Sequence, residues 1–435
     1  MNLIVIVADS LRVDHLGAYG SSVKTPNIDR LAGEGALFEN AYAENLPTMP
    51  CRTAWWTGQF LFPSRGWQPL EVDDVLLAEV LWSRGYRSAL VTDTYHMHKP
   101  GYNCGRGFDS TLFVRGQEYD PWVLEGDVDL EEFHRLRGDE SDAMWRGRFE
   151  QYLRNRTRFT SEEEHCAPRV FTRAMRWLED ASQRQRDNLF LWIDSFSPHE
   201  PWDPPSPFRE MYDPDYDGQE LIDPVPGPVQ GYMSPEELAH TRALYAGCVS
   251  LVDKWVGIFL DRLRDLGLYD NSLIMFTSDH GEPFGEHDVV RKAGALRYDY
   301  LAHIPWIVRH PQGLGAGKRF EDFVQPPDLM PTVLEALGAE HDLKFGGRSL
   351  LPILSGQRES LRDFAITGWF ERGSAIRTED WTCFLDHGAD EPCELYSRRD
   401  DPAEKHNLAG ECPDVCAELG ARLKDFAKEA SAPQD

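Results

Sequence analysis

Five short runs of apolar residues recur along this 435-residue chain, separated by segments whose apolar residues have helical spacing. The runs lie at 3–8, 88–91, 189–193, 273–276 and 304–308. Strands that are buried on both faces read as near-continuous apolar runs, and their alternation with helices indicates a layered α/β architecture. The sequence therefore predicts an α/β fold with a large, mostly parallel central sheet and helices on both faces.

Polar and titratable residues follow directly after four of these runs. They are Asp9 and the stretches 92–96, 194–199 and 278–282. Because ligands of an open parallel sheet bind outside the carboxyl ends of its strands, these residues are predicted to meet at one edge. Asp9, Asp279 and His280 together form a suitable ligand set for a divalent metal ion, although each alone is typical of a helix cap or a loop.

The stretch 46–58 contains the candidate nucleophile. Pro50 stands just inside a predicted helix start, and Thr48 precedes it beside backbone N–H groups that have no partner within the helix. Such a helix end attracts phosphate or sulfate, and Arg52, one turn further on, can direct its guanidinium group to the same anion. The pattern predicts an anion site in which Thr48 attacks, with an ordinary capped helix as the structural alternative.

The chain divides into two predicted regions. Residues 1–340 are expected to form the catalytic α/β domain, with an insertion at 110–168 where the strand rhythm stops. A long amphipathic helix is predicted over 235–266. Residues 341–435 are expected to form a small C-terminal α+β subdomain with an antiparallel sheet. Its expected elements are strands at 374–378, 381–385 and 394–396 and a helix over 413–430.

The net charge of −28 argues against nucleic acid or an anionic membrane as a partner. A small anionic ester remains compatible as substrate if positive charge is concentrated in one site. No apolar run approaches the roughly 18 residues that a membrane span needs. The eight scattered cysteines suit reduced thiols, so a cytoplasmic location is expected. The sequence leaves open whether the chain forms a homo-oligomer.

Several longer motifs resemble a known family. They are the stretches 7–20, 25–32, 197–202 and 278–287, together with 394–396, 401–404 and 407–408 near the C-terminus. Over nearly its whole length the chain resembles the sulfatase branch of the alkaline phosphatase superfamily. This resemblance implies that Asp9, Thr48, Asp279 and His280 hold one divalent ion, either Mn, Zn or Ca.

The resemblance also implies roles for further residues. Arg52 would fix the nucleophile loop and the oxyanion. His199 would protonate or orient the leaving group, and Lys292 would bind nonbridging oxygens of the ester. His96 is a weaker candidate for the same work, because the family's Gly-Lys-x-His segment keeps its His here and loses its Lys.

One departure from the family pattern bears on the chemistry. Family sulfatases place a Cys or Ser, matured to formylglycine, first in the pattern Cys-x-Pro-Ser-Arg. Here Thr48 stands first and cannot mature in this way, whereas Cys51 occupies the Ser position. A formylglycine hydrate expels the bound anion through its second hydroxyl, but a threonyl ester needs activated water. We therefore expect a metal-dependent hydrolase of phosphate monoesters or diesters, with phosphonate esters included.

Other interpretations remain compatible with the sequence. The chain could be a sulfatase that works without formylglycine, a transferase that passes the threonyl-bound group to an alcohol, or a degenerate member that binds anions without turnover. A second metal ion could use Asp194, His199 and either His287 or His303, although Arg52 and Lys292 already supply positive charge there. Trp202 is the aromatic residue that best suits a substrate contact.

Overall fold

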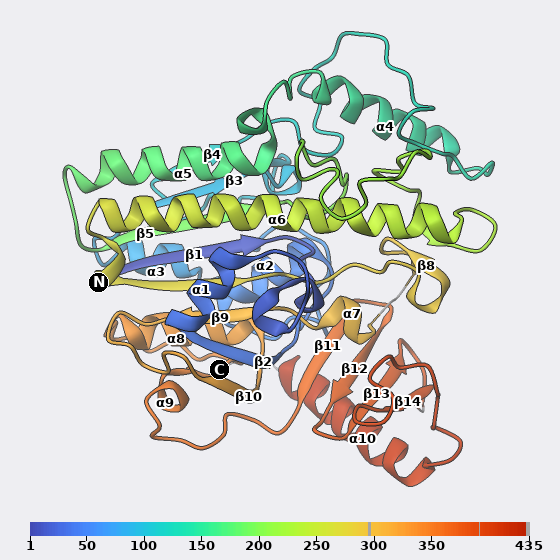
Figure 1. Ribbon diagram of the computed structural model, residues 1–435. Coiled ribbons are helices and arrows are strands. Elements are labelled where there is room, and N and C mark those ends of the chain that lie inside the picture. Colours follow the sequence, from blue (N-terminus) through green and yellow to red (C-terminus); the bar gives the residue numbers. More distant parts are fainter. Residues whose placement is uncertain (295–296, 391, 432–435) are drawn as a thin grey trace.

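An eight-stranded sheet forms the centre of the computed structural model, which describes residues 1–294, 297–390 and 392–431 (Figure 1). Its strands are β1 Asn2–Ala8, β2 Ala36–Ala41, β3 Arg87–Thr92, β4 Ser110–Phe113, β5 Leu189–Ser195, β7 Ser272–Thr277, β9 Trp306–Arg309 and β10 Arg319–Val324. They lie in the order β10-β2-β9-β7-β1-β5-β3-β4. Only β9 is antiparallel to its neighbours, so the predicted mostly parallel sheet is confirmed.

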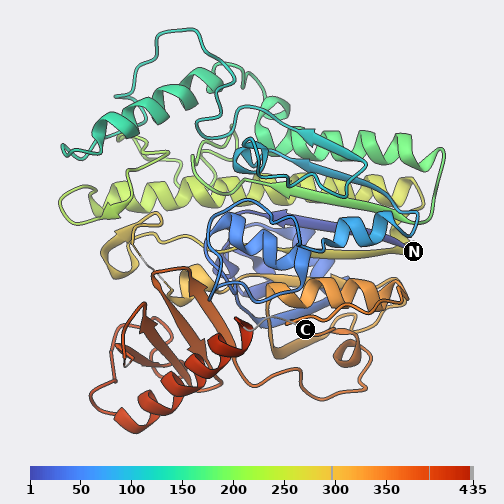
Figure 2. The same cartoon turned by 180° about the vertical axis from the view of Figure 1, so that it is seen from behind.

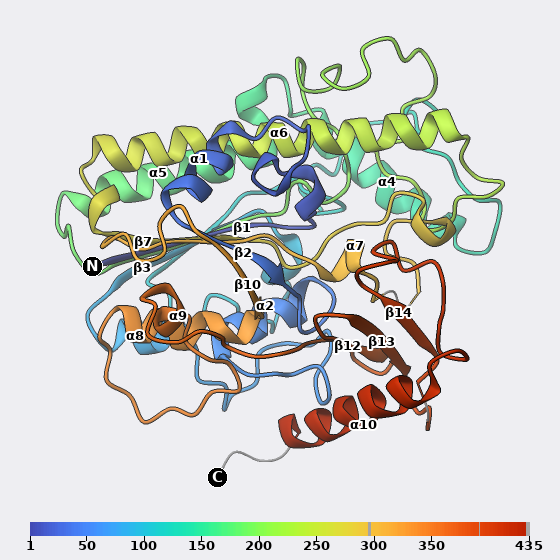
Figure 3. The ribbon, with the colours of Figure 1, turned by 60° about the horizontal axis from the view of Figure 1, so that its bottom comes forward.

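Helices cover both faces of this sheet, as Figure 3 shows. One layer consists of α1 Pro26–Glu34, α5 Cys166–Ser182 and α6 Pro235–Asp265, and the other of α2 Thr48–Thr57, α3 Leu77–Trp82 and α8 Leu329–Ala336. Successive side chains of a strand point to opposite faces. In β1, Ile4 and Ile6 accordingly join the core under the first layer, while Leu3 and Val5 join the core under the second. Every residue of β1 is buried, which explains its unbroken apolar run.

The register of the central strands brings the predicted site residues to one edge. Val7 of β1 lies opposite Thr277 of β7 and opposite Asp194 of β5. Asp9 and Asp279 each follow two residues later and therefore leave the sheet side by side. The backbone N–H of Asp9 still bonds to the carbonyl of Ser195, at 2.9 Å.

The expected insertion at 110–168 is shorter than the sequence indicates. Its first four residues form β4, a half-exposed edge strand parallel to β3, and residues 166–168 already belong to α5. An edge strand needs no continuous apolar run because only part of it is buried, so the pattern does not reveal it. The segment between β4 and α5 contains α4 Asp142–Arg156 and lies at the top of Figure 1.

A four-stranded antiparallel sheet follows in the C-terminal part, with α10 packed against it (Figure 2). Its elements are β11 Ala365–Trp369, β12 Gly373–Arg377, β13 Trp381–Asp386, β14 Glu394–Ser397 and α10 Pro413–Ala430. The predicted strands and helix are present, whereas β11 was not predicted. Gly368 interrupts the apolar pattern of β11, and the backbone there approaches the ring of Phe62 too closely for a side chain.

Helix α6 is the element that comes nearest to a membrane span, contrary to the expectation that no segment would. Its length and composition alone would allow it to cross a bilayer, yet 89% of its most apolar window is buried inside the protein. The helix packs between α1 and α5. The remaining short elements are α7 Asp299–Ala302, α9 Leu351–Leu354, β6 Gly227–Pro228 and β8 Val289–Val290.

Candidate active site

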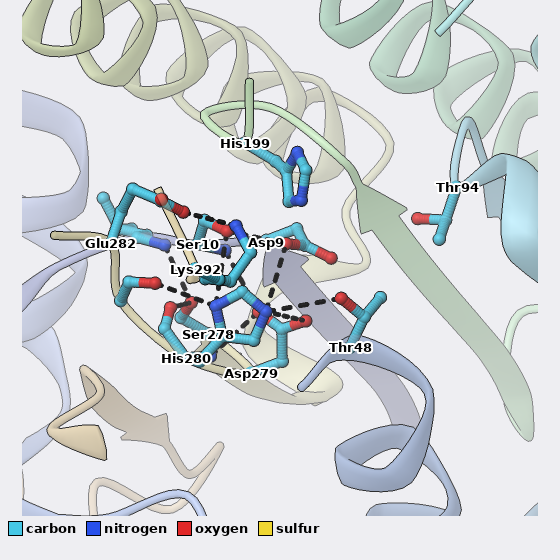
Figure 4. Close-up of polar contacts among 12 residues, drawn as sticks. Asp9, Ser10, Thr48, Thr94, His199, Ser278, Asp279, His280, Glu282 and Lys292 are labelled. Carbon is cyan, nitrogen blue, oxygen red and sulfur yellow. Dashed lines mark hydrogen bonds and ion pairs between the residues drawn. The ribbon is translucent and has the colours of Figure 1, made fainter. Parts of the chain in front are cut away.

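Thr48 is the first residue of α2, and its side chain points into the sheet edge (Figure 4). The side chain is buried, with 2% of the residue exposed. Its hydroxyl lies 3.3 Å from Nε2 of His280. Nδ1 of His280 donates to the Gly281 carbonyl at 2.8 Å, so Nε2 carries the lone pair and the Thr48 hydroxyl donates to it. The helix start therefore presents its hydroxyl to the predicted metal ligands.

Asp9, Asp279 and His280 converge on one point with their acceptor atoms. One ligand atom from each lies within 4.8 Å of the others, and all three side chains are fully buried. Burial lowers the pKa of His280 to about 4, which keeps the imidazole neutral and able to bind a metal. Burial and the charge of Asp279 raise the pKa of Asp9. A divalent cation would relieve this repulsion, so the residues fit such an ion.

Arg52 contacts this cluster and uses all of its N–H groups in hydrogen bonds. Nε and Nη2 bind the Asp194 carboxylate, at 3.0 and 2.7 Å, and Nη2 also binds Asp9 at 2.9 Å. Nη1 binds Asp279 at 2.6 Å and the Thr48 carbonyl at 2.9 Å. All five N–H groups of a guanidinium are thereby used. Of its two expected roles, the structure supports fixing the nucleophile loop, because no N–H group is left for an oxyanion.

Lys292 occupies a different electrostatic setting on the other side of the cluster. Its ammonium group pairs with Glu282 and, at 3.2 Å, with Glu200. Although burial opposes the charge, these carboxylates raise the pKa of Lys292, so it stays protonated. Burial raises the pKa of Glu282 to about 8, and its Oε1 has no hydrogen-bond partner within the described structure. Lys292 thus provides a cation beside the predicted metal ligands.

His199 approaches the cluster from a third side (Figure 4). Its ring centroid lies 6.5 Å from that of His280. Nδ1 donates to the Glu200 carbonyl at 2.8 Å, which leaves Nε2 as a proton acceptor. Burial lowers the pKa of His199 to about 3. In this state the imidazole is suited to accept a proton or orient a group.

His96 lies farther out, on the short helical turn after β3. Its Nε2 is 2.8 Å from a carboxylate oxygen of Glu118, which comes from the segment between β4 and α5. The centroid of its ring lies 6.2 Å from that of Phe196, and the Phe196 centroid lies 4.0 Å from that of His199. The structure therefore places His96 beyond His199, one aromatic ring away from it.

Two family models match this chain. The model of the Sulfatase family matches residues 1–339. The chain belongs to the sulfatase family. The model of the N-sulphoglucosamine sulphohydrolase C-terminal region matches residues 285–429. Membership in the family makes the chain an ester hydrolase that binds a divalent metal ion, for which Asp9, Asp279 and His280 are the candidate ligands.

The relatives include hydrolases with different names. The multifunctional alkaline phosphatase superfamily protein PehA of Trinickia caryophylli is 28% identical, and the match covers 99% of this chain and 94% of that protein. An arylsulfatase of Clostridium perfringens is 26% identical, over 83% of this chain and 80% of that protein. The crystal structure of the phosphonate monoester hydrolase of Agrobacterium radiobacter superposes with a TM-score of 0.79 at 24% identity, covering 99% and 96% of the two chains.

The alternative ligand set for a second metal does not assemble around this sulfatase-family site. Asp194 is held by Arg52 and accepts a further bond from Thr94 at 2.9 Å. His287 is bonded to the carbonyl of Glu404, at 2.7 Å, and His303 to that of Glu39, at 2.6 Å. Among the residues that the structure describes, Asp9, Asp279 and His280 form the group of His, Cys, Asp or Glu side chains whose ligand atoms lie close enough together to hold a metal ion.

Three residues around the site were given no role by the sequence interpretation. Glu200 directly follows His199, and Glu282 lies two residues after His280. Their positions within the recognised motifs could therefore have indicated them. Glu118 belongs to a segment without period, and nothing in the sequence links it to His96. Trp202 was expected to suit a substrate contact, but it is fully buried, donates to the Pro198 carbonyl at 3.0 Å and packs on Phe284.

Proposed function

We propose that the chain hydrolyses phosphate monoesters or diesters, phosphonate esters included, with Thr48 as nucleophile. The carrying observation is the buried Thr48 hydroxyl at the start of α2, bonded to Nε2 of His280. Asp9, Thr48, Asp279 and His280 are the proposed ligands of one divalent ion. A nitrogen ligand with two carboxylates suits Mn²⁺ or Zn²⁺ better than Ca²⁺, which prefers oxygen.

The proposed reaction has two steps. A bound divalent ion would lower the pKa of a neighbouring hydroxyl and polarise an ester oxygen. Thr48 Oγ1 attacks the phosphorus atom, the bond from phosphorus to the alcohol oxygen breaks, and Lys292 neutralises a nonbridging oxygen. The proton of the Thr48 hydroxyl passes to the departing alcohol oxygen, and Nε2 of His199 is placed to relay it because its Nδ1 is fixed on Glu200. Water then attacks the same phosphorus atom, the bond to Thr48 Oγ1 breaks, and one proton of this water returns to Oγ1 while the hydroxyl stays on phosphorus.

The residue type at position 48 favours phosphate over sulfate in this proposal. A threonyl ester has no second hydroxyl on the same carbon, so the alkoxide-driven release available to a formylglycine hydrate is closed to it. Release requires attack of water at the central atom. Phosphate esters follow this route in the phosphodiesterase and phosphatase relatives whose nucleophile is Thr or Ser. The relative named as multifunctional is compatible with this wider ester chemistry.

A sulfate ester is the second candidate substrate. It is favoured by the extent of the sulfatase family match, which includes a C-terminal region named for a sulphohydrolase, and by the arylsulfatase among the relatives. Lys292 and the proposed metal site would suit either tetrahedral anion. The two proposals differ in the central atom that water must attack.

We also propose a small anionic ester as the partner and the cytoplasm as the location. All eight cysteines are free thiols, which suits a reducing compartment. The excess of acidic residues disfavours polyanions and anionic membranes over the whole surface.

The deciding experiment measures kcat/KM on matched 4-nitrophenyl esters: phosphate monoester, phosphodiester, phosphonate and sulfate, each with Mn²⁺ or Zn²⁺. We expect one of the phosphorus esters to be the best substrate. Thr48→Ala should lower kcat at least about 10³-fold, since a nucleophile acts as a unit with its site. A clear preference for the sulfate would replace the phosphate proposal with the second candidate.

A matched control lies on the same helix. The Thr57 hydroxyl donates within α2 to the Thr53 carbonyl, so Thr57→Ala removes a similar group away from the site. It should retain activity, and Thr48→Ser should recover most of it. Phosphate covalently attached to the peptide that contains Thr48, detected by mass spectrometry after rapid quenching, would support the intermediate. Full activity of Thr48→Ala on every ester would refute the nucleophile.

A further inference from the structure

Two cations near the site have no carboxylate within ion-pair distance. Lys99 follows the short helical turn Tyr95–His98 after β3, and Arg148 lies on α4. Both lie over aromatic rings, and within residues 1–294, 297–390 and 392–431 neither forms an ion pair. Glu118 attracts Lys99, and Asp223 attracts Arg148, only from a longer distance.

Both cations lie on the same tyrosine ring. The Lys99 ammonium is 5.9 Å from the centroid of Tyr119 and 5.3 Å from that of Tyr95. The Arg148 guanidinium is 4.6 Å from the centroid of Tyr119 and 4.8 Å from that of Trp145. Cation–π attraction holds each charge, but the two like charges near one ring repel each other. An anion that pairs with both cations would offset this repulsion.

The aromatic rings lead from these cations to the site. Tyr95 and Tyr119 contact the ring of His96, with centroids 5.7 and 5.9 Å away. His96 is linked through Phe196 to His199, which faces the metal ligands. Site residues such as Thr48 are buried, whereas Lys99, Tyr119 and Arg148 are partly exposed. A series of ring contacts thus links these partly exposed cations to the buried site.

Arg148 is also connected to the site through Trp145 and Arg291. Trp145, one turn before Arg148 on α4, has the guanidinium of Arg291 over its ring at 5.0 Å. Arg291 binds Glu200, the residue that also pairs with Lys292. The segment between β4 and α5 therefore contributes Tyr119, Trp145 and Arg148 to the surroundings of the site.

We propose that Lys99 and Arg148, supported by Tyr95, Tyr119 and Trp145, bind a second negatively charged group carried by the alcohol portion of the ester. A ring in that alcohol would contact the parts of these aromatic side chains that the two cations leave uncovered. The inference rests on the proposed function, since it concerns the leaving-group side of the same site. The preferred substrate class is then an ester whose ring-containing alcohol is itself anionic.

The test compares two esters that differ by one charge: the 4-nitrophenyl ester and the 3-carboxy-4-nitrophenyl ester, each as phosphate or sulfate, whichever is hydrolysed faster. The wild-type ratio of kcat/KM, carboxylated over plain, should exceed one. Arg148→Ala should lower this ratio about 5-fold or more, as expected for loss of a charge pair. Lys99→Ala should act in the same direction.

Two further variants serve as controls. Arg146 lies on the same helix, is exposed and has no ion pair or ring contact in the described chain, so Arg146→Ala should leave the ratio unchanged. Arg148→Lys keeps the charge and should restore most of the ratio. A wild-type ratio of one or less, or an equal fall of the ratio in Arg146→Ala and Arg148→Ala, would overturn the proposal.

A binding measurement separates this inference from the proposed function. If neither ester is hydrolysed, the proposed function fails and the subsite is tested by calorimetry with 5-hydroxy-2-nitrobenzoate, the product of the charged ester. The wild type should bind it more tightly than 4-nitrophenol, and Arg148→Ala should remove the difference. Equal binding of the two phenols by the wild type would end the proposal.

Discussion

Arg52 and Arg148 have opposite surroundings. Arg52 is fully buried and gives all its N–H groups to Asp9, Asp194, Asp279 and the Thr48 carbonyl. Arg148 is partly exposed, lies over the rings of Tyr119 and Trp145, and forms no ion pair among the described residues. A buried cation whose N–H donors are all used stabilises the folded protein. A cation with free donors is available to a ligand.

The difference follows from the cost of burying charge. Three buried carboxylates require a cation, since burial of an unpaired charge costs several kcal/mol. An exposed cation on aromatic faces has no such obligation and gains only a modest attraction. Residue type alone therefore does not distinguish a structural arginine from a binding one.

Removal of Arg52 is the strongest test of this comparison. Arg52→Ala leaves three buried carboxylates without their guanidinium, so we expect the free energy of unfolding to fall by about 3–5 kcal/mol. Urea denaturation without added divalent ions measures this loss. A fall below about 1 kcal/mol would show that Arg52 is not the electrostatic centre of the cluster.

Asp93 provides a carboxyl group that has no such cation. Burial raises its pKa to about 7; its Oδ1 accepts from the Phe196 N–H at 2.6 Å, and its Oδ2 has no hydrogen-bond partner in the described structure. The folded carboxyl keeps its proton up to about pH 7, whereas the unfolded one loses it near pH 4. The contribution of Asp93 to folding stability should therefore decrease as the pH rises from about 4 to 7 and then level off.

Asp93→Asn keeps the accepting oxygen and removes this titration. We expect the variant to match the wild type near pH 4 and to be more stable at pH 8, by at most about 4 kcal/mol. Urea denaturation at both pH values measures the difference. An unchanged gap between variant and wild type across this range would show that the pKa of Asp93 is not raised.

A bound divalent ion should stabilise the folded protein by neutralising carboxylates that Arg52 also contacts. At a free Mn²⁺ concentration 100 times its Kd, we expect the free energy of unfolding to increase by about 2.7 kcal/mol. His280→Ala removes the nitrogen ligand and leaves the ion pairs of Arg52 in place, so the increase should largely disappear. Asp93→Asn, outside the proposed ligand set, should keep it. An equal increase in His280→Ala would place the ion elsewhere.

The smallest effect is expected at Arg148. Arg148→Ala removes cation–π contacts at a partly exposed position, so the free energy of unfolding should fall by less than about 1 kcal/mol. Arg146→Ala on the same helix should have no measurable effect. A loss at Arg148 comparable to that at Arg52 would erase the distinction between the two arginines and make Arg148 a structural residue.

Much of the fold could be predicted because its strongest signals are local. Strand β1 is buried on both faces, so its sequence shows the apolar run directly. The half-exposed β4 and the Gly-containing β11 lack such a run and were missed. Asp9 and Asp279 were expected together because they follow neighbouring parallel strands, and the register confirms that placement.

The sequence by itself determined the α/β architecture, the sheet edge at which the candidate site lies and the choice of Thr48 as the proposed nucleophile. Only the tertiary structure decided which polar groups are already satisfied. Arg52 meets Asp194 and Asp279 from 142 and 227 positions away, and Glu118 meets His96 from an aperiodic segment. Residue type and local spacing specify what a side chain can bind. Whether its donors are occupied depends on groups that distant strands and loops bring to it.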